Sequence, residues 1–415
     1  MLLFVTMFGF LFISSVSFAQ NNPSANDEEA IKSIISQYFN NYFDSFKYLK
    51  TANTSNIIEE NDDTLLYKII NECEVEVSRE FGIGYKDYSY SIDYKDILIN
   101  NNQAQVGLLI DLDYQCQNTL DIKSGIYNVD YDFKLKHDGN KWFITKIDSG
   151  FDEFEQYKAS YREKNKAGLK GQDLQKKMKE EKLNDIVKMK KQFEESKLMP
   201  SPHPDTSTTG SDSVTAAASY TYFSPRGTAY AERFAESSQS SRFFYTAGSG
   251  GDCTNFVSQC VWAAFGGYVE GNDTKTKSNI ANKVRMTSTW YAGTGGGSSN
   301  WESVSSLWNY ATQSKTLGPN GYGFNNDRVY TYINPRYEDI GEVYQVRNGS
   351  SGSYAHSVYT TDMNPNPTSY SDIFVSQHSY DKLNRPLTNL ISSWGGSNCY
   401  MRNIDFTVYT SYFNS

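Results

Sequence analysis

The stretch Gly248-Ser249-Gly250-Gly251-Asp252-Cys253-Thr254-Asn255-Phe256-Val257-Ser258-Gln259-Cys260 decides the fold of the second half of the chain. A glycine-rich turn leads into apolar residues at helical spacing, which predicts a helix that starts at Cys253 with Asp252 as its N-cap. The unpaired N–H groups of a helix N-terminus stabilise a thiolate and lower its pKa. Cys253 is therefore a candidate nucleophile, and a buried or disulfide-bonded cysteine is the alternative.

Length and charge limit the class of protein. The 415 residues are enough for two or three domains with real hydrophobic cores. The formal net charge of −9 argues against nucleic acid and against an anionic membrane surface as the main partner. We expect a globular protein that acts as a monomer.

Residues 1–19 have the pattern of a secretory signal peptide. Residues 2–16 form an apolar stretch, and Ser17 and Ala19 place small residues at the −3 and −1 positions of a cleavage site before Gln20. An uncleaved anchor is the alternative, but the apolar stretch is short for a membrane span. We expect a secreted, extracellular protein that is soluble once the signal is removed.

The chain has five cysteines, an odd number for an exported protein, so at least one is left unpaired within the chain. Cys73 and Cys116 both lie in strand-like runs and are the candidate disulfide. Cys260 and Cys399 either pair or remain buried as small hydrophobic residues. Cys253 is then the cysteine left over.

Residues 27–150 predict a small α+β domain. Apolar residues recur at helical spacing over 27–48, and from Cys73 to Ile147 the period changes to two, as in strands. A helix followed by an antiparallel meander suggests a cystatin-like or cone-shaped sheet. The one histidine there, His137, lies in a predicted hairpin turn and is expected at the surface. We expect a spacer or binding domain, because no catalytic constellation is present.

Two connecting segments follow. Residues 151–199 are dense in Lys, Glu and Gln and predict a charged helical connector, either solvated or weakly packed. Residues 200–218, including His203, predict a flexible linker. Residues 219–415 then form the second folded unit. Its expected helices are 222–236, the Cys253 helix and 299–312, and its expected strands are 339–346, 355–360, 373–378 and 404–409.

Two histidines follow Cys253, and each lies in a strand-like run. His356 is the candidate base that takes the thiol proton and later protonates the leaving amine. His378 is the candidate group that holds the His356 imidazole in the right tautomer. The backbone N–H of Cys253 and a donor from Tyr222 are the candidate oxyanion contacts. A zinc site is a weaker alternative because closely spaced Cys or His pairs are absent, and two unrelated histidines are another.

The second unit resembles the putative amidase domain of exported bacterial proteins, a branch of the papain-like, NlpC/P60-type cysteine hydrolases. The resemblance implies a Cys-His-polar apparatus, cleavage of an amide in a cell-wall or other peptide, and no cofactor. By position, Cys253 is similar to the nucleophile, His356 to the base and His378 to the orienting residue. The resemblance covers about the last 195 residues. The stretches that carry it are Tyr222 to Ala231, Gly251 to Gln259, Ala355 to Val358, and Ser376 to Leu387.

Three further residues are candidates for contacts to the substrate or the oxyanion: Tyr222, Asp252 and Asn255. The resemblance also makes Asn255 a structural or secondary site residue. One departure is Gly341-Glu342, where the family more often has Gly-Asp before the strand that carries the base.

The sequence therefore predicts a secreted cysteine amidase or peptidase whose α+β catalytic domain follows a small sheet domain. A non-catalytic module that binds cell wall or peptide on the same fold is the alternative from another class. An acyltransferase would use the same residues, so the sequence does not separate it from a hydrolase.

Overall fold

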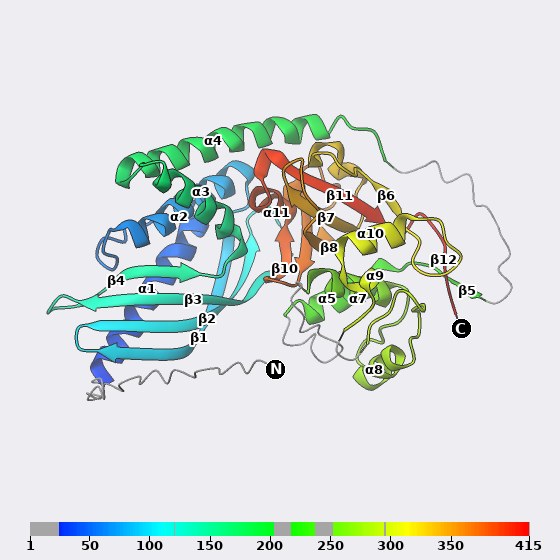
Figure 1. Cartoon of the computed structure of the whole chain (residues 1–415), viewed down its shortest axis with the longest axis horizontal. Helices are drawn as coiled ribbons and strands as arrows, with labels where there is room; N and C mark the ends of the chain where they lie inside the picture. Colours follow the sequence, from blue (N-terminus) through cyan, green and yellow to red (C-terminus); the bar gives the residue numbers. More distant parts are fainter. Residues whose placement is uncertain (1–24, 120, 203–216, 237–251, 294–295, 415) are drawn as a thin grey trace, which may run out of the picture.

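The computed structural model describes residues 25–119, 121–202, 217–236, 252–293 and 296–414. The predicted signal peptide, the linker histidine His203 and the glycine turn before Asp252 lie outside the described residues. The chain has the predicted α+β fold, in which helices pack against one large antiparallel sheet (Figure 1).

The N-terminal half consists of two helices followed by an antiparallel meander. The first helix agrees with the expected span, and its apolar side chains, among them Ile35, Phe39 and Phe43, are buried against the sheet. Along β2 the buried and exposed residues alternate, as the period of two predicts. The elements are α1 (Ala25–Tyr48), α2 (Asp62–Phe81), β1 (Tyr85–Asn100), β2 (Gln103–Cys116), β3 (Ser124–His137) and β4 (Trp142–Ser149).

The segment around Cys73 is helical, which corrects the prediction of a strand there. Asn61 caps α2 through a capping box, and Gly82, in the left-handed conformation at φ 67°, ends it. Both of these capping residues lie outside the run in which Val75 and Val77 alternate with charged residues. The short alternation is therefore accommodated on a helix whose ends are fixed by its caps.

The predicted disulfide between Cys73 and Cys116 is absent, and all five cysteines are free. Cys73 points from α2 into the core of the N-terminal half, and Cys116 ends β2. The pairing was inferred from two strands, and one of those strands is a helix. Cys260 and Cys399 likewise remain buried thiols in separate clusters of the C-terminal half.

In the C-terminal half, helices cover both faces of the strands. The predicted helix at 222–236 forms with Pro225 in its first turn, and the predicted Cys253 helix also forms. The elements are β5 (Ala217–Tyr220), α5 (Ser224–Phe234), α7 (Cys253–Ala264), α8 (Asp273–Ala281), α9 (Ser299–Glu302), α10 (Val304–Thr312), β6 (Tyr322–Phe324), β7 (Val343–Asn348), β8 (His356–Met363), β9 (Ile373–Gln377), β10 (Asp381–Pro386), α11 (Leu387–Ser393), β11 (Cys399–Asp405) and β12 (Ser411–Asn414).

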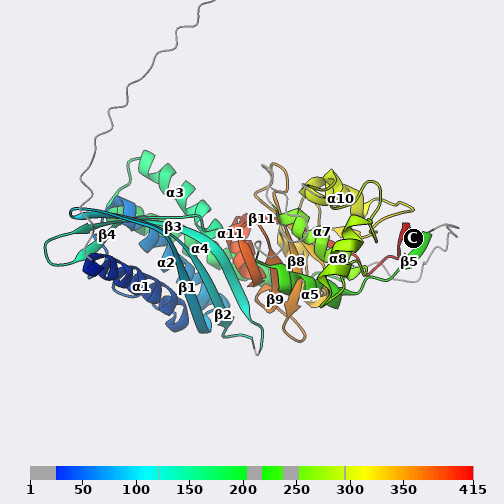
Figure 2. The same ribbon diagram turned by 90° about the horizontal axis from the view of Figure 1, so that it is seen from below.

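One sheet runs through both halves of the molecule. Its strand order is β1-β2-β3-β10-β9-β8-β7-β11-β6, with β4 also paired to β3. The join is the antiparallel pairing of β3 with β10, in which Tyr127 lies opposite Asp381 and Gly125 opposite Leu383. Figures 1 and 2 show the two halves side by side across this join. The first half is thus hydrogen-bonded into the second.

The charged connector also links the halves, although weak packing was one of the expectations for it. It forms α3 (Glu155–Lys166) and the long α4 (Gly171–Ser196), which runs from one half to the other (Figure 1). Near its start Leu174 is buried in the N-terminal core, and near its end Met189 and Phe193 are buried in a C-terminal cluster. Its sparse apolar residues are therefore the contacts that dock it.

Four buried charges fasten the segment after β4 to β10. Lys382 binds Asp152 and lies 3.3 Å from Glu153, while Arg385 lies 2.9 Å from Glu153 and 3.5 Å from Asp152. The side chains of both basic residues are 1% exposed. Burial alone would raise the pKa of Asp152, but Lys382 and Arg385 hold it below its usual value.

Within the described residues, no helix has both the length and the hydropathy that crossing a bilayer requires.

We expect Asp152→Asn to lower the free energy of unfolding by about 3–5 kcal/mol, because it leaves the Lys382 ammonium buried without its closest carboxylate. Urea unfolding at pH 7 measures this change. Glu60→Gln, which breaks the exposed pair with Lys68, is the matched control and should change stability by less than about 1 kcal/mol.

The double variant Asp152→Leu/Lys382→Met removes both charges and should recover most of the lost stability, since apolar residues of similar size replace buried ion pairs at little cost. Equal losses in Asp152→Asn and Glu60→Gln would contradict the importance given to the buried cluster.

Candidate active site

Cys253 is the first residue of α7 and lies where the helix N–H groups are unpaired. Burial by itself raises the pKa of its thiol. The His356 imidazole, the Ser357 backbone N–H and the Thr254 hydroxyl outweigh that effect and lower the pKa of Cys253 to about 7. The structure therefore brings together the predicted nucleophile and the predicted base.

His356 opens β8, as predicted, and its ring is held by stacking. The ring lies 5.5 Å from the Trp394 ring, centroid to centroid, and the two planes are inclined by 9°. Its Nε2 is buried and has no hydrogen-bond partner among the described residues. His356 also contributes to lowering the pKa of Asp152, after the larger effects of Lys382 and Arg385, so the two side chains are close enough to attract.

Contacts that reach the N-terminal half hold Trp394 in place. Arg385 donates to the Ser393 hydroxyl at 2.6 Å and to the Asn389 carbonyl at 3.0 Å, which fixes the end of α11 just before Trp394. The same guanidinium is paired with Glu153. A chain of contacts thus runs from the segment after β4 to the ring that stacks on His356.

His378 directly follows β9 but does not orient His356 as predicted. Its Nδ1 lies 2.6 Å from Asp252 Oδ2 and its Nε2 lies 2.5 Å from the Phe234 carbonyl. Both ring nitrogens face acceptor oxygens, an arrangement that favours the doubly protonated ring. Burial lowers the pKa of His378, but the hydrogen bonds and charge of its neighbours, chiefly Asp252, raise it overall.

Asp252 has a different role from the N-cap that the sequence predicts. Its side chain makes no cap hydrogen bond to α7. The carboxylate instead pairs with His378 and accepts a hydrogen bond from Asn255 Nδ2 at 2.6 Å. Asn255 Oδ1 in turn accepts from Trp301 Nε1 at 2.8 Å. This buried network fixes the residue before the nucleophile, and it engages the side chains of both Asp252 and Asn255.

Tyr222 is not placed as an oxyanion donor. Its buried hydroxyl donates to the Gly341 carbonyl at 2.7 Å and lies 2.9 Å from the Tyr359 hydroxyl. The adjacent Phe223 N–H bonds to the Ala264 carbonyl, at the opposite end of α7 from Cys253. At a rise of about 1.5 Å per residue these ends are roughly 16 Å apart. The order of residues along the chain did not reveal this separation.

Glu342, the departure from the family pattern, lies in a separate buried cluster. Asn403 Nδ2 donates to Glu338 Oε2 at 2.6 Å and to Glu342 Oε2 at 2.8 Å. Burial and the Glu338 carboxylate raise the pKa of Glu342 well above its usual value. Its contacts to Tyr344 and Asn403 brace the start of β7.

The other four cysteines differ from Cys253 in how their surroundings shift the thiol pKa. Burial raises the pKa of Cys73 and of Cys116 to about 12, and it also raises the pKa values of Cys260 and Cys399. Within the described part of the chain, no cluster of three or more His, Cys, Asp or Glu side chains could hold a metal ion.

A cavity of about 200 Å³ borders Asp252 at the junction of the two halves. One wall comes from β3 and the segment after β4, and the other from the turn between β9 and β10. Its charged lining residues are mostly acidic, namely Asp130, Asp152, Asp252, Asp381 and Lys382. Asp252, which directly precedes Cys253 in the chain, lines this cavity, whereas Cys253 and His356 are not among its lining residues.

Comparison with known proteins supports an amidase domain. Residues 221–402 match the family model described as "Putative amidase domain". No curated protein matches the chain. Among solved structures, the chain is similar to the Kfla4162 protein from Kribbella flavida at 11% identity and a TM-score of 0.22, over 30% of this chain and 92% of that one. The family match indicates amide hydrolysis by the C-terminal half.

The sequence motifs did not indicate the residues in other segments whose contacts support the site. Trp394 follows α11 and Trp301 belongs to α9, and neither segment carries a histidine or cysteine that would mark it. The tryptophans themselves could have marked these segments, because a buried indole N–H needs a hydrogen-bond acceptor. Asp152 gave no local signal at all, because its partners lie 230 residues away or more.

We expect iodoacetamide to alkylate Cys253 with a rate that rises with pH around a midpoint near 7, because only the thiolate reacts. The other four cysteines should remain unmodified below about pH 9, since burial raises their pKa values. Peptide mapping of the alkylated protein measures both.

His356→Asn should move the midpoint for Cys253 upwards by at least about one pH unit, because burial then acts without the opposing imidazole. His137→Asn is the control and should leave it unchanged; His137 is the last residue of β3 and not part of the turn that the sequence predicted. Equal labelling of all five cysteines would contradict the assignment of Cys253.

Proposed function

We propose that the chain is a cysteine amidase or peptidase of the papain-like, NlpC/P60 type, which hydrolyses an amide bond through a thioester. The observation that carries the proposal is the pairing of Cys253 with His356 at the N-terminus of α7. It gives one thiol a pKa of about 7 while the other four are shifted upwards. A thiolate near neutral pH beside an imidazole is the arrangement that nucleophilic catalysis requires.

Acylation begins when the Cys253 sulfur attacks the amide carbonyl carbon. A C–S bond forms, and the carbonyl oxygen takes the displaced electron pair near the Cys253 backbone N–H at the start of α7. The C–N bond then breaks, and the proton on the His356 imidazolium passes to the leaving amine. The products of this stage are the free amine and a thioester on Cys253.

Deacylation uses the same two residues in reverse. His356 takes a proton from water, and the resulting hydroxide oxygen forms a C–O bond with the thioester carbon. The C–S bond breaks, the carboxylic acid leaves, and the sulfur and the imidazole return to the state in which they began. Trp394 keeps the His356 ring in one orientation during both stages, and the Asp252–His378 pair fixes the residue that precedes the nucleophile.

The acidic cavity beside Asp252 suggests the substrate class. Asp152 and Asp252 are already paired with Lys382 and His378, so the attraction for a substrate ammonium that we propose comes from Asp130 and Asp381. Such an ammonium belongs to a free peptide N-terminus or a diamino acid side chain. Cell-wall peptides contain such groups, and the predicted signal peptide would bring the enzyme to them outside the cell. We include export and a cell-wall peptide substrate in the proposal.

A non-catalytic binding module on the same fold is the second candidate. Its specific support is burial, since Cys253 is only 5% exposed and His356 only 4%. A pair that stayed closed to substrate would leave the domain able to bind peptide or cell wall but not to cleave it. Binding to purified cell wall without release of soluble product would favour this candidate.

We expect Cys253→Ala to abolish the release of new amine termini from cell-wall peptides, and His356→Asn to reduce it by at least about 100-fold, because general acid–base catalysis contributes factors of that order. The readout is amine-reactive labelling of soluble products over time. Cys116→Ala, which removes another buried thiol, is the matched control and should retain the activity of the unaltered protein. Unchanged turnover in Cys253→Ala would rule out the mechanism.

A further inference from the structure

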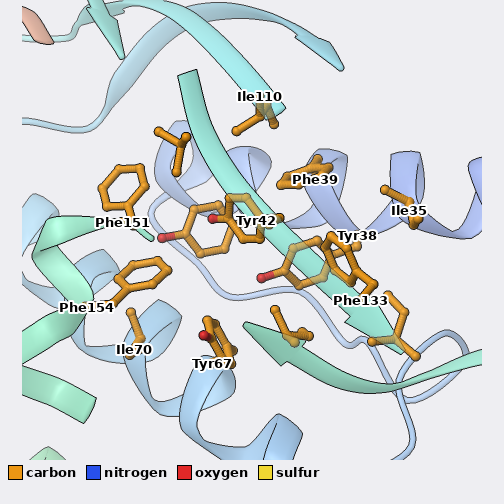
Figure 3. Packing of buried hydrophobic residues seen from close by; sticks show 14 of the residues in the cluster. Ile35, Tyr38, Phe39, Tyr42, Tyr67, Ile70, Ile110, Phe133, Phe151 and Phe154 are labelled. Atoms are coloured by element: carbon orange, nitrogen blue, oxygen red, sulfur yellow. The ribbon is translucent and has the colours of Figure 1, made fainter. Parts of the chain in front are cut away.

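The N-terminal half contains a cavity of about 500 Å³ that the proposed hydrolysis does not use. It is lined by α1, α2, the segment between them, and residues of β3, the β3–β4 turn and β4. Figure 3 shows Tyr38 and Tyr42 on α1 and Tyr67 on α2 extending into the same region. A volume of this size is typical of pockets that hold small organic ligands.

Two buried polar groups that line this cavity lack a partner among the described residues. They are the Tyr38 hydroxyl and the Asn71 side-chain nitrogen. Tyr38 is only 5% exposed. Buried hydroxyl and amide groups nearly always find a hydrogen-bond partner, so two unpartnered donors on residues that line one cavity point to a molecule that supplies acceptors.

The rest of the lining is polar and able to form hydrogen bonds. Between the aromatic rings lie these amide and hydroxyl side chains: Asn41, Ser45, Thr51, Asn53, Thr54, Ser55 and Thr64. The charged lining residues are of both signs: Glu60 lies 3.0 Å from Lys68, Glu72 lies 3.0 Å from Lys179, and the others are Glu59, Asp138 and Lys136. A lining with both signs of charge and many hydrogen-bonding groups favours a polar ligand without net charge.

We propose that this cavity binds a neutral saccharide of one or two rings. The aromatic faces of Tyr42, Tyr67 and Phe143 offer surfaces for the apolar side of a sugar ring, and the amide and hydroxyl groups match its oxygens. Tyr38 and Asn71 donate to acceptor oxygens of the ligand. The N-terminal half is then a binding domain joined rigidly to the catalytic half. Its binding of the saccharide does not depend on Cys253.

The test is isothermal titration calorimetry of the full chain with N,N′-diacetylchitobiose, a neutral disaccharide with amide carbonyl acceptors. We expect saturable binding with a Kd below about 1 mM. Tyr38→Phe and Asn71→Ala should each weaken it by about five- to tenfold, the effect of one lost hydrogen bond. Tyr409→Phe, at an exposed tyrosine of the C-terminal half, is the matched control and should not change Kd.

Melting temperatures close to that of the unaltered protein show that the variants are folded. Absence of saturable heat up to 10 mM disaccharide would overturn the proposal, as would binding that neither Tyr38→Phe nor Asn71→Ala weakens. Binding of the dipeptide Ala-Ala in place of the disaccharide would also overturn it and indicate a peptide site. Cys253→Ala should bind the disaccharide unchanged, which separates this proposal from the proposed hydrolysis.

Discussion

The burial of one sulfur atom is the constraint on which the C-terminal half depends. Removing the Cys253 thiol from water disfavours its charged form, so an isolated cysteine at this depth would be protonated and inert. The His356 imidazole, the Ser357 N–H and the Thr254 hydroxyl reverse that effect. Cys260 lies two turns further along the same helix without such neighbours, and burial raises the pKa of its thiol. The difference between the two thiols comes from their neighbours at each end of α7.

The position of His356 is therefore a structural requirement that extends well beyond the C-terminal half. Its ring stacks on Trp394, and the end of α11 before Trp394 is tied by Arg385, which pairs with Glu153. The pairing of β3 with β10 brings these charges together. Since the two halves share one sheet and a buried charge cluster, relative movement between them would disturb the placement of His356 beside Cys253. This rigidity is what a spacer domain on a flexible linker would lack.

The same architecture gives the N-terminal half a position from which to act on the substrate. β3 and the segment after β4 form a wall of the cavity beside Asp252, while the larger cavity lies among α1, α2 and the far end of the meander. Two separate cavities suit two chemically distinct parts of one polymer. A protein that held a glycan with one half and cut an attached peptide with the other would need the fixed geometry that the shared sheet provides.

The local features of this chain follow from its sequence alone. Helical spacing and a glycine turn predicted α7 with Cys253 at its start, and a strand pattern placed His356 at the start of β8. These succeeded because each depends on residues within a few positions of one another. The partners of His378, the location of Tyr222 and the docking of α4 were decided only by tertiary structure. Asp252 lies 126 residues from His378, and Asp152 lies 230 residues from Lys382. No periodicity encodes contacts at such separations, because they form only when the halves pack. The helix at Cys73 was likewise decided by tertiary structure. Its caps and its burial against the sheet had more effect than the short alternating run that predicted a strand.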